Sequence, residues 1–324
     1  MTEPFVYITR AVPEAALTVL RNGLPGARIV VNSHDRNLSH TELLTAAQGC
    51  DALICTLADP IDDSLLRALA LKLRVVAQYA VGVNNIALDT ARELGIAVCN
   101  TPDVLTDATA EVAVGLMLAC ARRFVEGDVL TRQGRFSGWA PLFHLGHGVY
   151  GKTVGVVGAG RIGLRVARTM RDGFGCEVVY HARNRRPDWE QALGARFAAV
   201  DELVAQSDFI TLHCPLTPQT RHLIDARRIG LMKPTAVLVN TARGPVVDEA
   251  ALADALREGR IASAGLDVYE HEPAIHPQLV GLANVVLLPH IGSATHETRD
   301  EMGRMCARAV VAVLSGAKPM HQVV

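Results

Sequence analysis

Three side chains in the second half of the chain have the types needed to reduce a ketone. They are Arg243 in the segment NTARG, Glu272 in LDVYEHEP and His290 in LLPHIGSAT. Hydride addition leaves negative charge on the carbonyl oxygen, so the site needs a proton donor there and a cation for a neighbouring carboxylate. His290 and Arg243 meet these needs, and a Glu272 carboxylate beside the imidazole would favour its protonated form. Each residue alone has an ordinary structural explanation, so the hypothesis depends on all three occurring in this order.

A glycine-rich segment, VGVVGAGRIG, follows an apolar run and precedes an amphipathic stretch at 161–171. Gly158 allows a tight turn, Gly160 lets the backbone approach a pyrophosphate, and Gly163 permits close packing of a helix on a strand. Glycines at this spacing can also form a simple packing turn. The strand–turn–helix context favours a dinucleotide-binding site.

The segment about 20 residues after these glycines indicates which dinucleotide is preferred. An acidic residue normally accepts hydrogen bonds from the adenosine ribose at this place. Here the segment contains Arg183, Asn184, Arg185 and Arg186, and no carboxylate. Guanidinium groups suit a 2′-phosphate, so the segment favours NADPH/NADP while leaving NADH/NAD open. The alternative is an arginine loop that only faces solvent.

A fourth feature is the segment YAVGVNN, which follows an apolar run in the first half of the chain. Backbone N–H groups around Val81 and Gly82 could bind a carboxylate. An ordinary turn is the alternative interpretation.

The elements that position these residues follow from a repeated pattern. Short runs rich in Val and Ile alternate with amphipathic stretches, which is typical of β-α-β units around a parallel sheet. The first half predicts one doubly wound unit. Its strands are expected at 5–8, 28–31, 52–56, 74–78 and 97–100, and its helices at 13–21, 41–48, 63–70 and 86–94.

A second set of about six strands has the size of a complete dinucleotide-binding sheet. Arg243 and His290 then lie just past strand ends, and Glu272 lies a few residues past another, at the edge where open α/β sheets bind ligands. The strands of this set are expected at 153–157, 177–181, 209–213, 236–240, 262–267 and 284–289.

Three further segments complete the predicted architecture. Residues 105–130 have a long helical pattern, 133–150 resemble a functional or interface loop, and 295–314 are helical and are expected to pack on the first domain. We therefore predict an α/β protein with two doubly wound parallel-sheet domains, Rossmann-like or flavodoxin-like, and an active-site cleft between them. Residues 1–101 with 295–324 would form the substrate domain, and 102–294 the dinucleotide-binding domain.

Composition argues against several classes of function. The 324 residues include 32 Lys+Arg and 33 Asp+Glu, so nucleic-acid binding is disfavoured. No apolar run reaches the roughly 20 residues of a membrane span, and the N-terminal segment MTEPFVYITR lacks the pattern of a secretory signal. We expect no membrane association and a cytoplasmic location. The seven cysteines include no C-x-x-C pair, so we expect buried thiols and no metal site.

Several segments together resemble a known family, the D-2-hydroxyacid dehydrogenases, and within it the glyoxylate/hydroxypyruvate reductases. The resemblance covers nearly the whole chain, and the order and spacing of the segments are more specific than any single motif. The segments are YAVGVNNI, ARELGIAVCNTPDVLTDATAE, GVVGAGRIG, SDFITLHCPLTPQT, VLVNTARGPVVDE, SAGLDVYEHEP and NVVLLPHIGSAT.

This resemblance implies that Arg243 clamps the substrate, that Glu272 tunes His290, and that His290 donates the proton. It also implies that Val81 and Gly82 bind the substrate carboxylate. We count Ser293 among the substrate-binding residues as well. For the cofactor, the resemblance implies contacts at Gly160, Arg161, Ile162, Pro215, Thr241, Asp267 and Gly292.

The family resemblance further implies a homodimer. Its interface would contain the predicted long helix and the loop that follows it, with Trp139 and Phe143 near the partner's active site.

Two departures from the family pattern concern the substrate. Asn84-Asn85 replaces a pair that usually contains Asp, and Phe143 and His144 stand where the reductases often carry Trp. The predicted activity is NADPH-dependent reduction of a small 2-oxoacid such as glyoxylate or hydroxypyruvate. The alternatives are 2-ketogluconate or another D-2-hydroxyacid substrate and, more remotely, a corepressor-like scaffold that senses NAD(P)H.

Overall fold

The computed structural model describes residues 3–34 and 36–324. Within it the chain forms two units. Unit 1 contains the residues up to Leu105 together with Ser293–Val324, and unit 2 contains Thr106–Gly292.

Unit 1 is a five-stranded, fully parallel sheet with the order β2-β1-β3-β4-β5. This is the flavodoxin-like order of a doubly wound sheet. The strands are β1 (Phe5–Ile8), β2 (Arg28–Val31), β3 (Ala52–Cys55), β4 (Val75–Gln78) and β5 (Ala97–Cys99), and the helices are α1 (Glu14–Gly23), α2 (His40–Ala47), α3 (Asp63–Leu69), α4 (Leu88–Glu93) and α13 (His296–Leu314).

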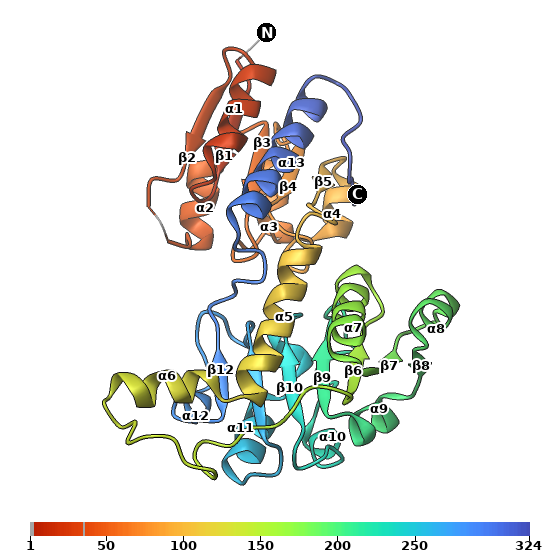
Figure 1. The fold of residues 1–324 in the computed structure, drawn as a ribbon. Coiled ribbons are helices and arrows are strands. Elements are labelled where there is room, and N and C mark those ends of the chain that lie inside the picture. Colours follow the sequence, from red (N-terminus) through yellow and green to blue (C-terminus); the bar gives the residue numbers. More distant parts are fainter. Residues whose placement is uncertain (1–2, 35) are drawn as a thin grey trace. The chain divides into compact units, whose positions relative to one another are not determined.

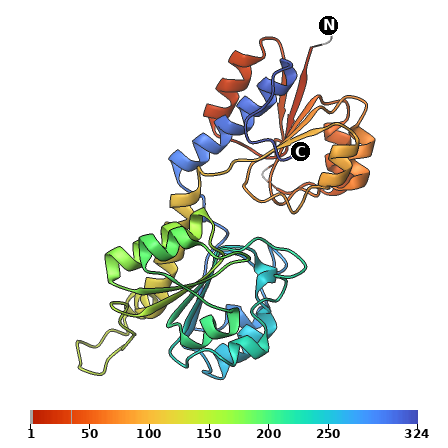
Figure 2. The same cartoon turned by 90° about the vertical axis from the view of Figure 1, so that its right-hand side faces the viewer.

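Both faces of this sheet are covered, which explains why three of its strands are buried at every position. One apolar layer packs the sheet against α1 and α13, whose buried side chains include Leu20, Met302 and Val310. The other packs it against α2, α3 and α4. Figures 1 and 2 show α1 and α13 side by side on one face, although they come from opposite ends of the chain.

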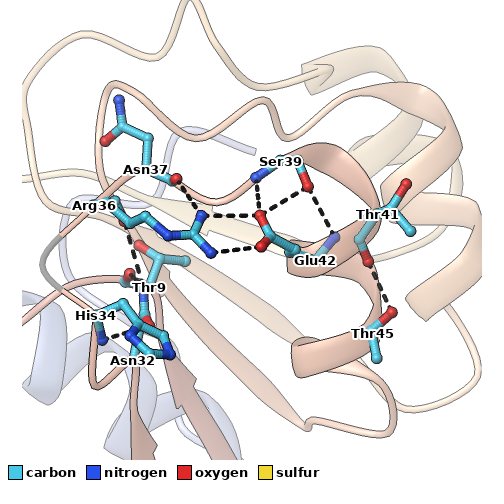
Figure 3. Close-up of polar contacts among 9 residues, drawn as sticks. All are labelled: Thr9, Asn32, His34, Arg36, Asn37, Ser39, Thr41, Glu42 and Thr45. Atoms are coloured by element: carbon cyan, nitrogen blue, oxygen red, sulfur yellow. Dashed lines mark hydrogen bonds and ion pairs between the residues drawn. The ribbon is translucent and has the colours of Figure 1, made fainter.

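The loop before α2 shows how local sequence fixes a helix start. Ser39 caps α2: its hydroxyl accepts from the Glu42 N–H, while the Glu42 carboxylate accepts from the Ser39 N–H at 2.8 Å. Arg36 then pairs with the same carboxylate, as Figure 3 shows. This reciprocal arrangement satisfies N–H groups that the first turn leaves without partners.

Unit 2 is a seven-stranded parallel sheet with the order β12-β11-β10-β9-β6-β7-β8. Its strand order changes direction between β9 and β6, as in a dinucleotide-binding sheet. The strands are β6 (Thr153–Val157), β7 (Glu177–His181), β8 (Arg196–Phe197), β9 (Phe209–Leu212), β10 (Val237–Asn240), β11 (Ser263–Leu266) and β12 (Val285–Leu287).

The helices of unit 2 also lie on both faces of the sheet. One apolar layer includes side chains of α5 (Thr106–Ala121), α7 (Arg161–Phe174) and α8 (Pro187–Leu193). The opposite layer includes α9 (Val200–Gln206), α10 (Ala226–Ile229), α11 (Glu249–Arg257) and α12 (Pro277–Val280). The predicted fold class, two doubly wound parallel sheets, is confirmed.

Two details of the prediction for unit 2 are wrong. The expected helix at 105–130 is two helices, α5 and α6 (Phe124–Arg132), because Arg123 adopts a left-handed conformation with φ of 54°. The sheet also has one strand more than expected, since the two-residue β8 is too short to produce a recognisable apolar run.

All seven cysteines are buried and free, as predicted. Across the described residues, no helix combines the length and apolar character needed to span a membrane.

Candidate active site

The chemically important residues of unit 2 follow the carboxyl ends of three neighbouring strands. Arg243 lies after β10, Glu272 after β11 and His290 after β12. Strands β10, β11 and β12 pair in parallel register, so these ends share one edge of the sheet. This is the edge at which open α/β sheets bind ligands.

His290 and Glu272 are in direct contact. The imidazole Nδ1 lies 2.8 Å from Glu272 Oε2, while Glu272 Oε1 accepts the N–H of Tyr269 at 3.0 Å. Both side chains remain about one-third exposed, at 34% and 37%. The contact engages Nδ1 and leaves Nε2 as the nitrogen that could transfer a proton.

The charge on Glu272 results from opposing effects. Burial disfavours the carboxylate, but the hydrogen bond and charge of His290, the Tyr269 N–H and the charge of Arg243 together lower the pKa of Glu272 below its ordinary value. Glu272 is therefore ionised at neutral pH, as a partner for an imidazolium must be.

Arg243 is a partly buried cation beside this pair. Burial lowers the pKa of its guanidinium, and the charge of Glu272 opposes that effect. Its Nη1 donates to the carbonyl of Ala242 at 2.6 Å. The side chain of Asn240 holds the backbone here: it accepts the N–H of Ala242 and donates to the carbonyl of Arg243. A guanidinium always carries its proton, so this position supplies a permanent positive charge.

The loop that carries His290 is held by Asp267. Its two carboxylate oxygens accept the N–H groups of Ile291 at 2.7 Å and Gly292 at 2.8 Å. Burial raises the pKa of Asp267, whereas these N–H groups and the charge of His290 act in the opposite direction. Thr109, near the start of α5, donates to the carbonyl of Gly292 at 3.0 Å. This role of Asp267 cannot be predicted from the sequence, because its partners are main-chain groups.

The glycine segment forms the predicted turn between β6 and α7. A Cβ on Gly158 would lie 2.5 Å from the Cys214 nitrogen, and one on Gly163 would lie 2.3 Å from the Gly158 oxygen, so neither position has room for a side chain. A Cβ on Gly160 would meet nothing within 4 Å. No side chain caps α7 at Gly160, so its first turn can offer N–H groups to a phosphate.

These residues fit a dinucleotide. Besides the open space at Gly160, two buried polar atoms at the same sheet edge have no hydrogen-bond partner among the described residues: Thr241 Oγ1 and His213 Nδ1. Burial lowers the pKa of His213 to about 3, so this imidazole is neutral. Buried polar groups normally have partners, so unpaired ones point to a bound molecule. His213 was not among the predicted site residues, although it follows the carboxyl end of β9 as His290 follows that of β12.

The arginine segment after β7 is only partly available to a ligand. Arg185 pairs with Glu190, and Arg186 pairs with Asp188 and also donates to the Ala159 carbonyl at 2.6 Å. Arg183 and Asn184 are exposed and make no hydrogen bond or ion pair with the part of the chain described. Of the three arginines, Arg183 is the one free to meet a phosphate.

In unit 1, the turn after β4 presents unpaired backbone donors. The carbonyls of Val81 and Gly82 accept from Asn100 at 2.8 Å and from Gln78 at 3.1 Å. Their N–H groups donate to no described residue. Two free N–H groups in one turn suit a carboxylate.

Two other predicted site residues lie outside this turn. Pro215 is exposed after β9, and Ser293 is half-buried where the chain returns to unit 1.

Unit 2 also has a cavity away from these residues. It measures about 480 Å³ and is lined by α5, α6 and the amino-terminal ends of β11 and β12, including Ser263 and Asn284. None of the predicted site residues lines it.

Three comparisons with known proteins agree in one family. The family model described as D-isomer specific 2-hydroxyacid dehydrogenase, NAD binding domain, matches residues 114–292. The glyoxylate reductase of Thermococcus onnurineus (strain NA1) is 47% identical over 321 residues, which cover 98% of this chain and 95% of that protein.

Solved structures are similar over the full length. A glyoxylate reductase from Paecilomyes thermophila has a TM-score of 0.86 at 34% identity, covering 100% of this chain and 99% of that one. An NADPH-dependent glyoxylate/hydroxypyruvate reductase from Sinorhizobium meliloti, in complex with NADP and malonate, has a TM-score of 0.85 at 30% identity, covering 100% and 97%.

Proposed function

The chain belongs to the D-isomer specific 2-hydroxyacid dehydrogenase family, and from this premise we propose that it reduces glyoxylate, hydroxypyruvate or a similarly small 2-oxoacid with NADPH. Membership makes the protein an NAD(P)-dependent oxidoreductase. The identity of the oxoacid, the preference for NADPH and the roles of individual residues are the proposed part.

The observation that carries the proposal is the contact of 2.8 Å between His290 and Glu272, beside the cation of Arg243. Reduction of a 2-oxoacid needs a proton for the carbonyl oxygen and a positive charge for the neighbouring carboxylate. This edge of the sheet provides both groups, together with the Glu272 carboxylate in contact with the imidazole.

A nicotinamide cofactor, when bound, would supply the hydride for the carbonyl carbon. His290 donates its Nε2 proton to the carbonyl oxygen as negative charge develops there, while Glu272 holds Nδ1 and favours the imidazolium. Arg243 binds the substrate carboxylate and the same oxygen with its planar guanidinium. In unit 1, the free N–H groups of Val81 and Gly82 are suited to bind a carboxylate.

For the cofactor, the open glycine turn at Gly158, Gly160 and Gly163 would hold the pyrophosphate, with Arg161 and Ile162 in the first turn of α7. Thr241 has a buried hydroxyl available for the same molecule. The exposed guanidinium of Arg183 supports the preference for NADPH, because it can pair with a 2′-phosphate. NADH remains the second cofactor to test.

A homodimer is also part of the proposal. The loop after α6 exposes Trp139 at 84% and Leu142 at 83%, and α6 exposes Phe124 at 55%. Monomeric proteins seldom leave so many large apolar side chains in contact with water over one segment. A second copy of this chain would cover them.

The test is a set of initial rates of cofactor oxidation. Purified protein would be assayed with glyoxylate, hydroxypyruvate, pyruvate and 2-ketogluconate, each with NADPH and with NADH. The proposal expects the highest kcat/KM for glyoxylate or hydroxypyruvate with NADPH. Faster turnover of 2-ketogluconate would refute the small-substrate proposal, and equal or better use of NADH would refute the cofactor preference.

A further inference from the structure

A buried carboxylate outside the catalytic set holds the loop that carries Glu272. Glu249, the first residue of α11, is only 4% exposed. Its Oε1 accepts the N–H of Glu270 at 2.6 Å, two residues before Glu272 in the chain. The main chain that leads to the catalytic carboxylate is therefore tied to the start of a helix.

The ionisation of Glu249 reflects this position. Burial raises its pKa, and the charge of Glu270 adds to the increase, while the N–H groups of Glu270 and His276 and the charge of His276 act against it. Burying a carboxyl group costs free energy unless it is hydrogen-bonded, and the N–H groups of Glu270 and His276 provide these bonds to Glu249.

Two other contacts hold the same stretch of main chain. The side chain of Glu270 pairs with the imidazole of His222, and the backbone N–H of His222 donates to the Pro245 carbonyl at 2.7 Å. Gly244, next to Arg243, touches the main chain of Tyr269 so closely that a Cβ would lie 1.8 Å from its carbonyl carbon. The loop that carries Arg243 and the loop that carries Glu272 are thus packed against each other at Gly244 and Tyr269.

We propose that Glu249 is a positioning residue: it fixes the main chain at Glu270 so that the Glu272 carboxylate faces His290. The proposal rests on the roles proposed above for Glu272 and His290. Without the Glu249 acceptor, the Glu270 N–H loses its only described partner. A buried N–H without an acceptor costs free energy, so the loop is expected to move until this N–H reaches water. A displacement of about 1 Å at a catalytic group can cost up to about 100-fold in rate.

The first readout is the protonation of His290, followed by NMR in the full-length protein without substrate. Glu249→Ala should lower the midpoint of the His290 titration by about half a pH unit or more, because the Glu272 carboxylate moves away from the imidazolium. The charges around the imidazole are Glu272 and Asp267, with Arg243 facing Glu272, and all are unchanged in this variant. Glu249→Gln keeps an acceptor oxygen and should restore most of the wild-type midpoint.

The second readout is a double-mutant cycle in kcat/KM. Glu249→Ala should reduce kcat/KM between about 10- and 100-fold in the wild type but less than about two-fold in a Glu272→Gln background, since its effect acts through Glu272. The matched control is Glu258→Ala, an exposed glutamate at the end of the same helix, which should leave both readouts unchanged.

A folded Glu249→Ala protein with a wild-type His290 titration would overturn the proposal. The proposal would also be overturned if Glu249→Ala reduced kcat/KM by the same factor in the Glu272→Gln background as in the wild type. If Glu249→Ala does not fold, His222→Gln takes its place, since it removes the second tether and should shift the midpoint in the same direction; no shift in that variant overturns the proposal. The NMR readout needs no turnover. A protein that reduces none of the oxoacids but shows the shift would refute the proposed function and leave this inference standing.

Discussion

At the scale of single side chains, the contact between His290 and Glu272 determines how activity depends on pH. Reduction needs a protonated His290, so kcat/KM should fall as the pH rises through the titration of this imidazole. Glu272→Gln removes the anion that favours the imidazolium, and the falling limb should move to lower pH. Because the pKa of Glu272 is below its ordinary value, the wild-type pair stays intact down to acidic pH. The measurement is kcat/KM from pH 5 to 10.

Arg243→Ala is the matching control, because this residue is proposed to bind substrate rather than to move the proton. It should raise KM and lower kcat together, and the falling limb should not move to lower pH, because the Glu272 anion remains. A profile that is identical in Glu272→Gln and wild type would contradict the role given to Glu272.

Arg183 is the side chain on which the choice of cofactor is predicted to depend. Arg183→Ser removes a guanidinium with no protein partner in the described chain, so the dissociation constant of NADPH should rise by about ten-fold while that of NADH stays unchanged. Fluorescence titration of both cofactors measures this. Arg168→Ser is the control, since this exposed arginine of α7 has no described partner either. If wild type and Arg183→Ser had the same dissociation constant for NADPH, Arg183 would not determine the preference for NADPH over NADH.

Side-chain type and strand-end position were enough to nominate Arg243, Glu272 and His290, and the structure brings the last two into contact. The role of Asp267 could not be foreseen in this way. Its partners are the N–H groups of Ile291 and Gly292, and the sequence of a loop does not reveal where its main chain turns. For the same reason the pairing of Arg185 with Glu190 was not anticipated.

At the scale of elements, apolar runs predicted strands closely where they are long and buried. The bounds of β6 and β7 agree with the prediction at both ends. Prediction failed where the local pattern carries no signal of the break. The apolar positions of α5 continue toward α6, and nothing in the residue type of Arg123 announces its left-handed conformation.

Gly244 provides a test of how tightly two catalytic loops are packed. A Cβ at this position would lie 1.8 Å from the Tyr269 carbonyl carbon, so Gly244→Ala must displace main chain. We expect a loss of about 1–3 kcal/mol in the free energy of unfolding, measured in urea, and a fall in kcat/KM.

Gly173→Ala is the control for this substitution, because Gly173 lies in α7 and a Cβ added there would meet no atom within 4 Å. Alanine is the better helix former, so this variant should gain up to about 1 kcal/mol. If Gly244→Ala were equally stable and active, the close packing of the two loops would have no functional consequence.

At the scale of the whole molecule, the exposed apolar loop predicts association. Light scattering after gel filtration should give twice the chain mass of 34.7 kDa. The double variant Trp139→Ser/Leu142→Ser should shift the protein toward monomer, because these side chains are among its most exposed apolar groups. Leu71→Ser, at a residue 99% exposed in unit 1, should leave the mass unchanged. A monomeric wild type at micromolar concentration would refute the dimer.

Because unit 1 is built from segments on either side of unit 2, it cannot complete its fold early in synthesis. The sheet of unit 1 needs α13, whose Met302, Cys306 and Val310 complete one apolar face, yet α13 follows unit 2 in the chain and leaves the ribosome after it. Unit 2 is continuous and can fold as soon as it emerges. The nascent N-terminal region must meanwhile keep an uncovered apolar surface, so it is the region that would gain most from a chaperone during synthesis.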